Sequence, residues 1–162
     1  MVLKENMKIH FLIDYENVGS TGFIGADLLC KEDYVTVFYN SSGTKIERMH
    51  IDAVEKLAGG FEIIKLIAPG KNALDFYIAV MVGQIIQSNP EYSIVIISKD
   101  KGFKSISDYC ACYTNYSRYI ISKENIEAGI VACDEDGSRK GTIIKRRQNY
   151  PWKMNMHHLK NE

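Results

Sequence analysis

The sequence predicts an α/β protein, a three-layer α/β/α sandwich with a mainly parallel central sheet. Segments rich in β-branched and aromatic residues alternate with longer segments whose apolar residues recur at helical spacing. Residues 11–13, with Ile9 just before them, form an apolar run that leads into Asp14, as expected of a strand buried on both faces. A length of 162 residues suits one domain of this class and is too short for two.

The first half of the chain supplies three strands and two helices. Residues 9–13 are the first strand, and residues 22–31 show helical spacing of their apolar positions. Residues 34–39 (YVTVFY) read as a strand ended by the turn cluster NSSG. Residues 45–58 place their apolar side chains on one helical face and stop at two glycines, and residues 61–67 form the third strand.

The second half continues the alternation. Residues 72–87 are the most apolar helix, and because they are apolar on several sides we expect this helix to be largely covered. A fourth strand is expected at residues 92–98, a short helix at 102–110, a fifth strand at 118–121 and a short helix at 123–129. Right-handed crossovers place the carboxyl ends of all these strands at one edge of the sheet.

The pattern weakens after Cys133. Residues 134–137 look like a turn, and residues 142–145 are predicted as a strand returning beside residues 130–132. We therefore divide the chain into one folded domain, residues 1–133, and a basic C-terminal extension, residues 134–162.

Charge is distributed unevenly along the chain. Residues 1–136 hold 13 Lys and Arg against 19 Asp and Glu, whereas residues 137–162 hold seven against one. An acidic body with a basic extension indicates either a polyanionic partner or an extension that folds back on the body. A solvated extension is the third alternative.

Several function classes lack their motifs. No G-x-G-x-x-G follows the first strand and no G-x-x-x-x-G-K-[ST] occurs, so a dinucleotide or P-loop nucleotide site is not supported. There is no G-x-S-x-G elbow for an acyl hydrolase. The four cysteines include one C-x-C pair but no zinc-ligand spacing.

Three acids stand where an α/β sheet places its ligands. Asp14 ends the first strand, Asp75 opens the apolar helix, and Asp100 follows the fourth strand. Carboxylates gathered at one edge repel one another unless a cation lies among them. Mg²⁺ and Mn²⁺ take such oxygen ligands, and metal-activated water suits attack on a phosphodiester. Each acid alone could instead cap a helix or shape a turn.

These motifs together resemble a PIN-like nuclease domain, most closely the NYN subgroup. The matching segments are DYEN at residues 14–17, KNALD at 71–75 and SKDKGF at 98–103, and the resemblance covers about residues 8–121. It implies a metal-dependent ribonuclease acting on single-stranded or structured RNA. By resemblance, Asp14, Asp75 and Asp100 are catalytic metal ligands, and Asn17 orients the first of them or the substrate.

The sequence departs from the NYN pattern at one position. Gly102 stands where the pattern S-G-D-x-D-F has a second acid. The missing carboxylate favours one metal ion over a two-metal clamp. Glu16 and Asp108 are the candidate substitutes, with Glu16 slightly preferred.

Basic residues near these acids fit an RNA partner. The lysines flanking the acids could hold backbone phosphates, and the arginines of the extension precede two aromatic residues, Tyr150 and Trp152. Alternatively, the two aromatic residues pack the extension on the body. The residues assigned to substrate binding are Lys71, Asn72, Ser98, Lys99, Lys101, Lys104, Arg146 and Arg147.

We therefore interpret the protein as an endoribonuclease that depends on Mg²⁺ or Mn²⁺, and we expect it to be cytoplasmic. One alternative is a PIN-like RNA-binding module that has lost turnover, and a less favoured one is a doubly wound phosphotransfer or regulatory domain. No apolar run approaches the length of a membrane span, so no membrane partner is expected. The oligomeric state is left open, a homodimer included.

Overall fold

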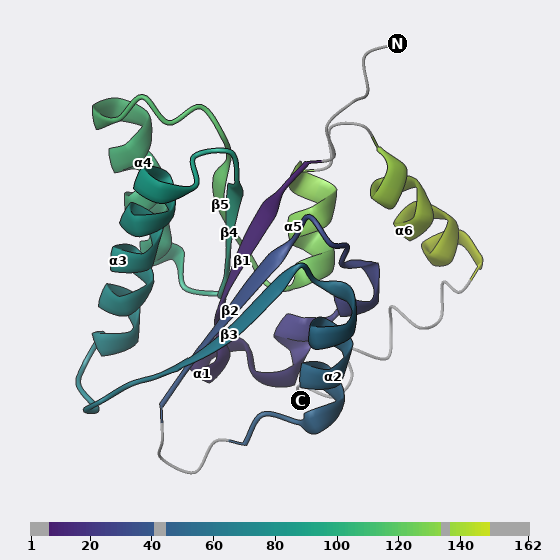
Figure 1. The fold of residues 1–162 in the computed structure, drawn as a ribbon, viewed down its shortest axis with the longest axis horizontal. Helices are drawn as coiled ribbons and strands as arrows, with labels where there is room; N and C mark the ends of the chain where they lie inside the picture. The colour runs from purple at the N-terminus through teal and green to yellow at the C-terminus, as the bar shows by residue number, and fades with distance from the viewer. Residues whose placement is uncertain (1–6, 41–44, 134–136, 150–162) are drawn as a thin grey trace.

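Five parallel strands form one sheet in the order β3-β2-β1-β4-β5 (Figure 1). The computed structural model describes residues 7–40, 45–133 and 137–149. Every neighbouring pair of strands is parallel. The α/β prediction is therefore confirmed. The strands are β1 (Ile9–Asp14), β2 (Tyr34–Tyr39), β3 (Gly60–Lys65), β4 (Ser93–Ile97) and β5 (Ile120–Lys123).

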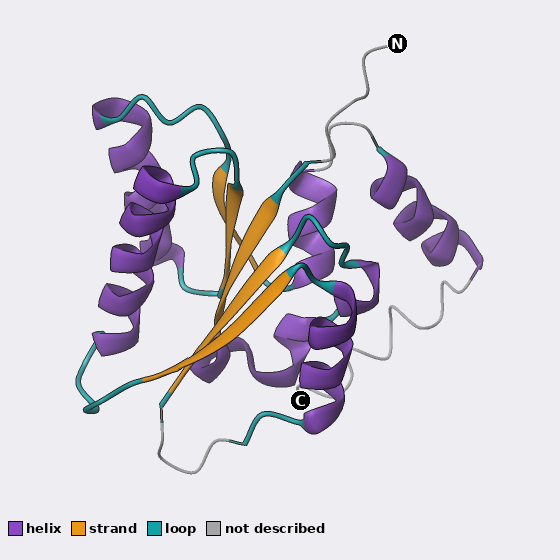
Figure 2. Ribbon diagram, viewed as in Figure 1, coloured by secondary structure: helices purple, strands orange, loops and turns teal. Residues whose placement is uncertain are grey.

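Helices cover both faces of this sheet (Figure 2). On one face lie α3 (Ala73–Ser88) and α4 (Lys104–Tyr113). The other face carries α1 (Tyr15–Val18), α2 (Arg48–Leu57) and α5 (Ile126–Cys133), with α6 (Ser138–Asn149) outside α5. The central strands β1 and β4 are buried along their whole length, which explains their continuous apolar sequences.

Each face has its own apolar core because side chains alternate along every strand. Phe11 and Ile13 of β1 join the core beneath α2 and α5. Leu12, between them, joins the core beneath α3 and α4. The register pairs Leu12 with Thr36 of β2 and Ile96 of β4, so the carboxyl ends of the three strands reach the same edge.

The segment predicted as a helix over residues 22–31 is instead two 3₁₀ helices, η1 (Gly19–Phe23) and η2 (Ala26–Leu28). Gly25 separates them with φ at 93°, in the left-handed region that favours glycine. A Cβ on Gly25 would come within 2.5 Å of the backbone nitrogen of Glu127. The turn therefore lets η2 approach α5 closely, and a continuous helix would not.

The strand predicted at residues 142–145 is wrong, because these residues lie in α6, and residues 130–132 lie in α5. Ile143 is only 1% exposed and joins the core beneath α5. It lies four residues after Arg139, on the same helical side. A turn is expected at residues 134–137, of which residues 134–136 lie outside the described part of the chain.

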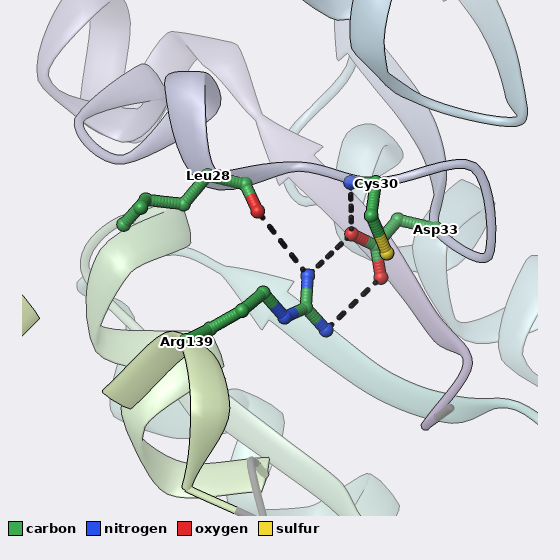
Figure 3. A network of polar contacts seen from close by, with 4 residues as sticks. All are labelled: Leu28, Cys30, Asp33 and Arg139. Atoms are coloured by element: carbon green, nitrogen blue, oxygen red, sulfur yellow. Dashed lines mark hydrogen bonds and ion pairs between the residues drawn. The ribbon is translucent and has the colours of Figure 1, made fainter. Parts of the chain in front are cut away.

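A buried ion pair helps to hold α6 on the body (Figure 3). Nη1 of Arg139 donates to Oδ2 of Asp33 at 2.5 Å, and the backbone nitrogen of Cys30 donates to the same oxygen at 2.9 Å. Nη1 also lies 3.5 Å from the carbonyl oxygen of Leu28. Because the Asp33 side chain is fully covered, α6 closes over a charge that would otherwise be unpaired.

The expectation that the apolar helix is largely covered is wrong for one of its faces. Phe76 is 66% exposed and Val80 is 64% exposed on α3. Leu74, Ile78, Val82 and Ile85 pack against the sheet from the opposite face of the helix. Within the described residues, no helix is both long enough and apolar enough to cross a membrane.

Candidate active site

Three acidic side chains from three elements line one cleft at the carboxyl edge of the sheet. Asp14 is the last residue of β1, Asp75 lies in the first turn of α3, and Asp100 caps η3 (Lys101–Phe103) after β4. The cleft has a volume of about 240 Å³. It is also lined by Glu16, Asn17, Asn40 and Asn72.

Asp14 is the most buried of the three acids, at 5% exposed. Ser98 Oγ donates to its Oδ2 at 3.0 Å, and the backbone N–H of Asn17 donates to it as well. Burial raises the pKa of Asp14 to about 6 despite these hydrogen bonds, and the charges of Asp75 and Glu16 add smaller upward shifts. Desolvation contributes more to this shift than the repulsion between carboxylates.

Ser98 and Asn17 tie the end of β1 to the loop that carries Asp100. The backbone nitrogen of Asp100 donates to Ser98 Oγ at 3.1 Å. The backbone nitrogen of Lys99 donates to Asn17 Oδ1 at 2.7 Å. Asn17 therefore positions the loop between Ser98 and Asp100 through its side-chain oxygen.

Asp75 and Asp100 line the same cleft, and the charge of Asp100 acts on the carboxyl group of Asp75. The pKa of Asp75 is raised, first by partial burial and then by the charge of Asp100. Asp100 Oδ1 accepts the backbone N–H of Gly102 at 2.7 Å, which fixes the start of η3. A Cβ on Gly102 would lie 3.1 Å from that oxygen. An acid at position 102, as in the NYN pattern, would therefore start next to Asp100.

A comparison with protein families decides the identity of this domain. The model of the PIN domain family matches residues 8–113. The chain belongs to the PIN domain family. No curated protein and no solved structure matched the chain. Assignment to the NYN subgroup stays a prediction. PIN domains are generally nucleases that typically use divalent metal ions.

The acids of this PIN domain suit a cation completed by other ligands. In the part of the chain that the structure describes, no group of three or more His, Cys, Asp and Glu side chains that could hold a metal ion is present. Mg²⁺ is usually bound by one or two carboxylates together with waters and substrate phosphates. Asp14, Asp75 and Asp100 offer oxygen donors of this kind in one cleft.

The two candidate substitutes for the missing acid lie in different places. Glu16 lines the cleft beside Asp14. Asp108 lies on exposed α4, where Lys104 Nζ donates to its two oxygens at 2.7 and 2.8 Å, and it does not line the cleft. Of the two candidates, Glu16 is therefore the one that lies in the cleft with the three acids.

The residues assigned to substrate binding divide among three places. Asn72 lines the cleft with φ at 60°, a left-handed conformation that is rare outside glycine and is often found at functional sites. Exposed Lys71 precedes it without lining the cleft. Around a neighbouring cavity lie Ser98, Lys99, Lys101 and Lys104.

Arg146 and Arg147 lie on α6, where both pair with acids of the body. Arg146 Nη1 lies 2.5 Å from Asp27 Oδ2, and Arg147 Nη2 lies 2.9 Å from Glu127 Oε1. Neither arginine lines the acidic cleft or the neighbouring cavity. These pairs favour the alternative in which the extension folds back on the body. Tyr150 and Trp152 lie outside the described residues.

Two polar residues at strand ends, Asn40 and Lys123, are among the lining residues that the sequence analysis did not identify. Asn40 directly follows β2 and lines the acidic cleft, and Lys123 ends β5 and lines the neighbouring cavity. Both follow the rule that ligands gather at the carboxyl ends of parallel strands. A polar residue at the end of a strand is therefore the signal in the sequence that identifies both.

Proposed function

We propose that this PIN domain is an endoribonuclease that depends on Mg²⁺ or Mn²⁺ and hydrolyses phosphodiester bonds of RNA with metal-activated water. The observation that carries the proposal is that Asp14, Asp75 and Asp100 line one cleft at the carboxyl edge of the sheet. Like charges placed together at a cleft are costly without a cation and are typical of functional sites.

The chain's own residues have distinct roles in this proposal. Asp14, Asp75 and Asp100 would hold the cation, which supplies Lewis-acid activation of water and neutralises phosphate charge. Glu16 adds a fourth acid to the cleft. Ser98 and Asn17 keep Asp14 and Asp100 in fixed relation through the hydrogen bonds between the two strand ends.

Lysines around the cleft would hold the RNA. Lys71, Lys99, Lys101 and Lys104 are all exposed near the acids, where they can meet backbone phosphates. Such contacts position the strand without reading its sequence. RNA is therefore proposed as the substrate class, with no sequence assigned to it.

Cleavage of a labelled RNA by the full chain tests the proposal. Cleavage should require Mg²⁺ or Mn²⁺, stop in EDTA, and fall by at least about 100-fold in Asp14→Asn, because the variant loses a charged donor of the cation. Asp52→Asn is the matched control, since Asp52 is exposed on α2 and pairs with Arg48. Metal-independent cleavage, or full activity in Asp14→Asn, would contradict the proposal.

The rival function is an RNA-binding module without turnover. Gly102 in place of an acid favours this rival, because one carboxylate of the NYN pattern is absent. RNA binding with no cleavage under any divalent cation would support it.

A further inference from the structure

A second and larger cavity adjoins the acidic cleft of the PIN domain. It has a volume of about 590 Å³ and lies between the loop after β4, helix α4 and the end of β5. Pockets that bind small organic ligands have volumes of roughly 300–1,000 Å³. We call it the lysine pocket and define it by Lys99, Lys101, Lys104, Lys123, Ile120 and Ile121.

The charge of the lysine pocket is not neutralised within the described chain. Four lysines line it against two acids, Asp100 and Glu124. Lys104 pairs with Asp108 at 2.7 Å. The side chains of Lys99, Lys101 and Lys123 make no hydrogen bond or ion pair with any described residue. Three cations are thus available to an anionic ligand.

The lysine pocket also has an apolar side. Ile120 and Ile121 belong to the edge strand β5. Because side chains alternate along a strand, Ile120 faces the side of the sheet that carries α4, and Ile121 packs on the opposite side. Ser107 and Ser122 add hydroxyl groups to the lining. Apolar surface with a few convergent polar groups is typical of pockets that orient a small ligand. Cations next to apolar surface suit a ligand with a phosphate at one end and a flat, weakly polar ring at the other.

Ser98 connects the lysine pocket to the acidic cleft. Its backbone nitrogen donates to the carbonyl oxygen of Lys123 at 2.9 Å, and its Oγ donates to Asp14 at 3.0 Å. Ser122 Oγ lies 3.3 Å from the carbonyl oxygen of Ser98. Asp100 lines both spaces. The two spaces therefore adjoin at Asp100, so an RNA strand bound at the acidic cleft can reach the lysine pocket.

We propose that the lysine pocket binds one nucleotide of the RNA, next to the phosphate at the acidic cleft. Lys99, Lys101 and Lys123 hold the phosphate of this nucleotide, and Ile120 contacts its base. The inference rests on the proposed function for its substrate class. It adds a subsite, and it gives roles to Lys123 and to the end of β5.

Adenosine 5′-monophosphate, titrated in EDTA into the full chain with labelled isoleucine δ1 methyl groups, tests the pocket without cleavage. The NMR signal of Ile120 should shift saturably, while that of Ile143, in the core under α6, should stay in place. Inorganic phosphate should bind at least about tenfold more weakly, because it lacks the base. An unmoved Ile120 signal, or equal affinity for phosphate alone, would overturn the inference.

Charge reversal at the two sheet edges supplies a matched pair of variants. Lys123 and Lys65 are the last residues of the edge strands β5 and β3, and only Lys123 lines the pocket. Lys123→Glu should weaken binding of adenosine 5′-monophosphate at least about tenfold, whereas Lys65→Glu should leave it unchanged. Equal binding by both variants would overturn the inference. If Lys123→Glu does not fold, Ser107→Trp should fill the pocket from α4 and abolish binding.

Two further results separate this inference from the proposed function. A short RNA should displace adenosine 5′-monophosphate from the pocket, and failure to do so would mean that the pocket holds a free nucleotide instead. Metal-dependent RNA cleavage without nucleotide binding would overturn the lysine pocket alone. Nucleotide binding displaced by RNA, without cleavage under any divalent cation, would overturn the proposed function and leave the subsite standing.

Discussion

At the scale of single residues, Asp14 and His10 on β1 are buried titratable groups with opposite shifts. Burial raises the pKa of Asp14 to about 6 and lowers the pKa of His10 to about 4. His10 Nε2 lies 2.8 Å from Thr36 Oγ1, and the His10 ring contacts the rings of Tyr34 and Tyr92. One strand thus carries an acid that resists ionisation at its active end and a histidine that resists protonation near its start.

The pKa shifts of Asp14 and His10 should have nearly opposite effects on how the free energy of unfolding of the metal-free protein depends on pH. Between about pH 4 and 6 the folded state holds more protons on Asp14 than the unfolded chain, so this contribution to stability falls as pH rises. Over the same range the folded state holds fewer protons on His10 than the unfolded chain does. The contribution of His10 to stability is therefore lost as the pH falls below about 6.5. Each of these pKa shifts corresponds to a change of about 3 kcal/mol in the free energy of unfolding.

Variants of these residues should therefore reveal opposite slopes. In EDTA, the stability of Asp14→Asn relative to the wild type should increase from pH 4 to pH 6, because the cost of ionising buried Asp14 is gone. The relative stability of His10→Gln should decrease over that range. Urea unfolding at each pH, compared with the wild type, cancels the contributions of other groups. Relative stabilities that do not change with pH would contradict the assigned shifts.

At the scale of elements, α6 is held by one apolar anchor and by ion pairs of unequal burial. Ile143 enters the core, and Arg139 pairs with fully covered Asp33. Burial raises the pKa of Asp33 despite the opposing effect of Arg139. Arg146 and Arg147 pair at the surface, where such interactions contribute about 0–1 kcal/mol each. The buried pair should dominate the docking of this helix.

Arg139→Met should lower the free energy of unfolding by about 3–5 kcal/mol, because Asp33 would be left buried without its cation. Arg139→Met combined with Asp33→Asn should recover much of this loss, since the uncompensated charge is removed while a side-chain oxygen remains for the Cys30 nitrogen. Urea unfolding of the two single variants and the double variant measures the coupling. Additive effects of the two substitutions would show that the pair is not a unit.

At the scale of the whole molecule, α6 brings part of the basic extension onto an acidic body. Its arginines meet Asp27, Asp33 and Glu127, which lie far from them in the sequence. None of the three acids lines the acidic cleft. The opposite charges of the body and the extension are therefore partly satisfied within the molecule, and the lysines near the cleft remain available to an RNA.

Replacing Arg146 and Arg147 together by glutamate should lower the melting temperature by a few degrees, since two surface pairs become repulsions. The salt dependence of binding to single-stranded RNA should stay unchanged. If the arginines bind phosphates instead, the slope should fall by about 0.7 for each lost contact. Fluorescence anisotropy across a salt series measures this slope. Lys145→Glu, at an exposed position of α6, is the control for added negative charge.

The sequence by itself determined the alternation of strands and helices and the acids at the strand ends. Both follow from local properties, the spacing of apolar residues and the position of polar residues after an apolar run. For the same reason β2 is found at residues 34–39 as predicted. Asp14 could be placed at the sheet edge because the strand before it is recognisable without knowing its neighbours.

Only the tertiary structure decided which surfaces meet. The exposed face of α3, the helical form of residues 142–145 and the position of Lys123 beside Ser98 depend on contacts between residues distant in sequence. The pKa of Asp14 likewise depends on how far the surrounding elements exclude water. Burial and juxtaposition are properties of the packed chain, and no spacing of residues along one segment encodes them.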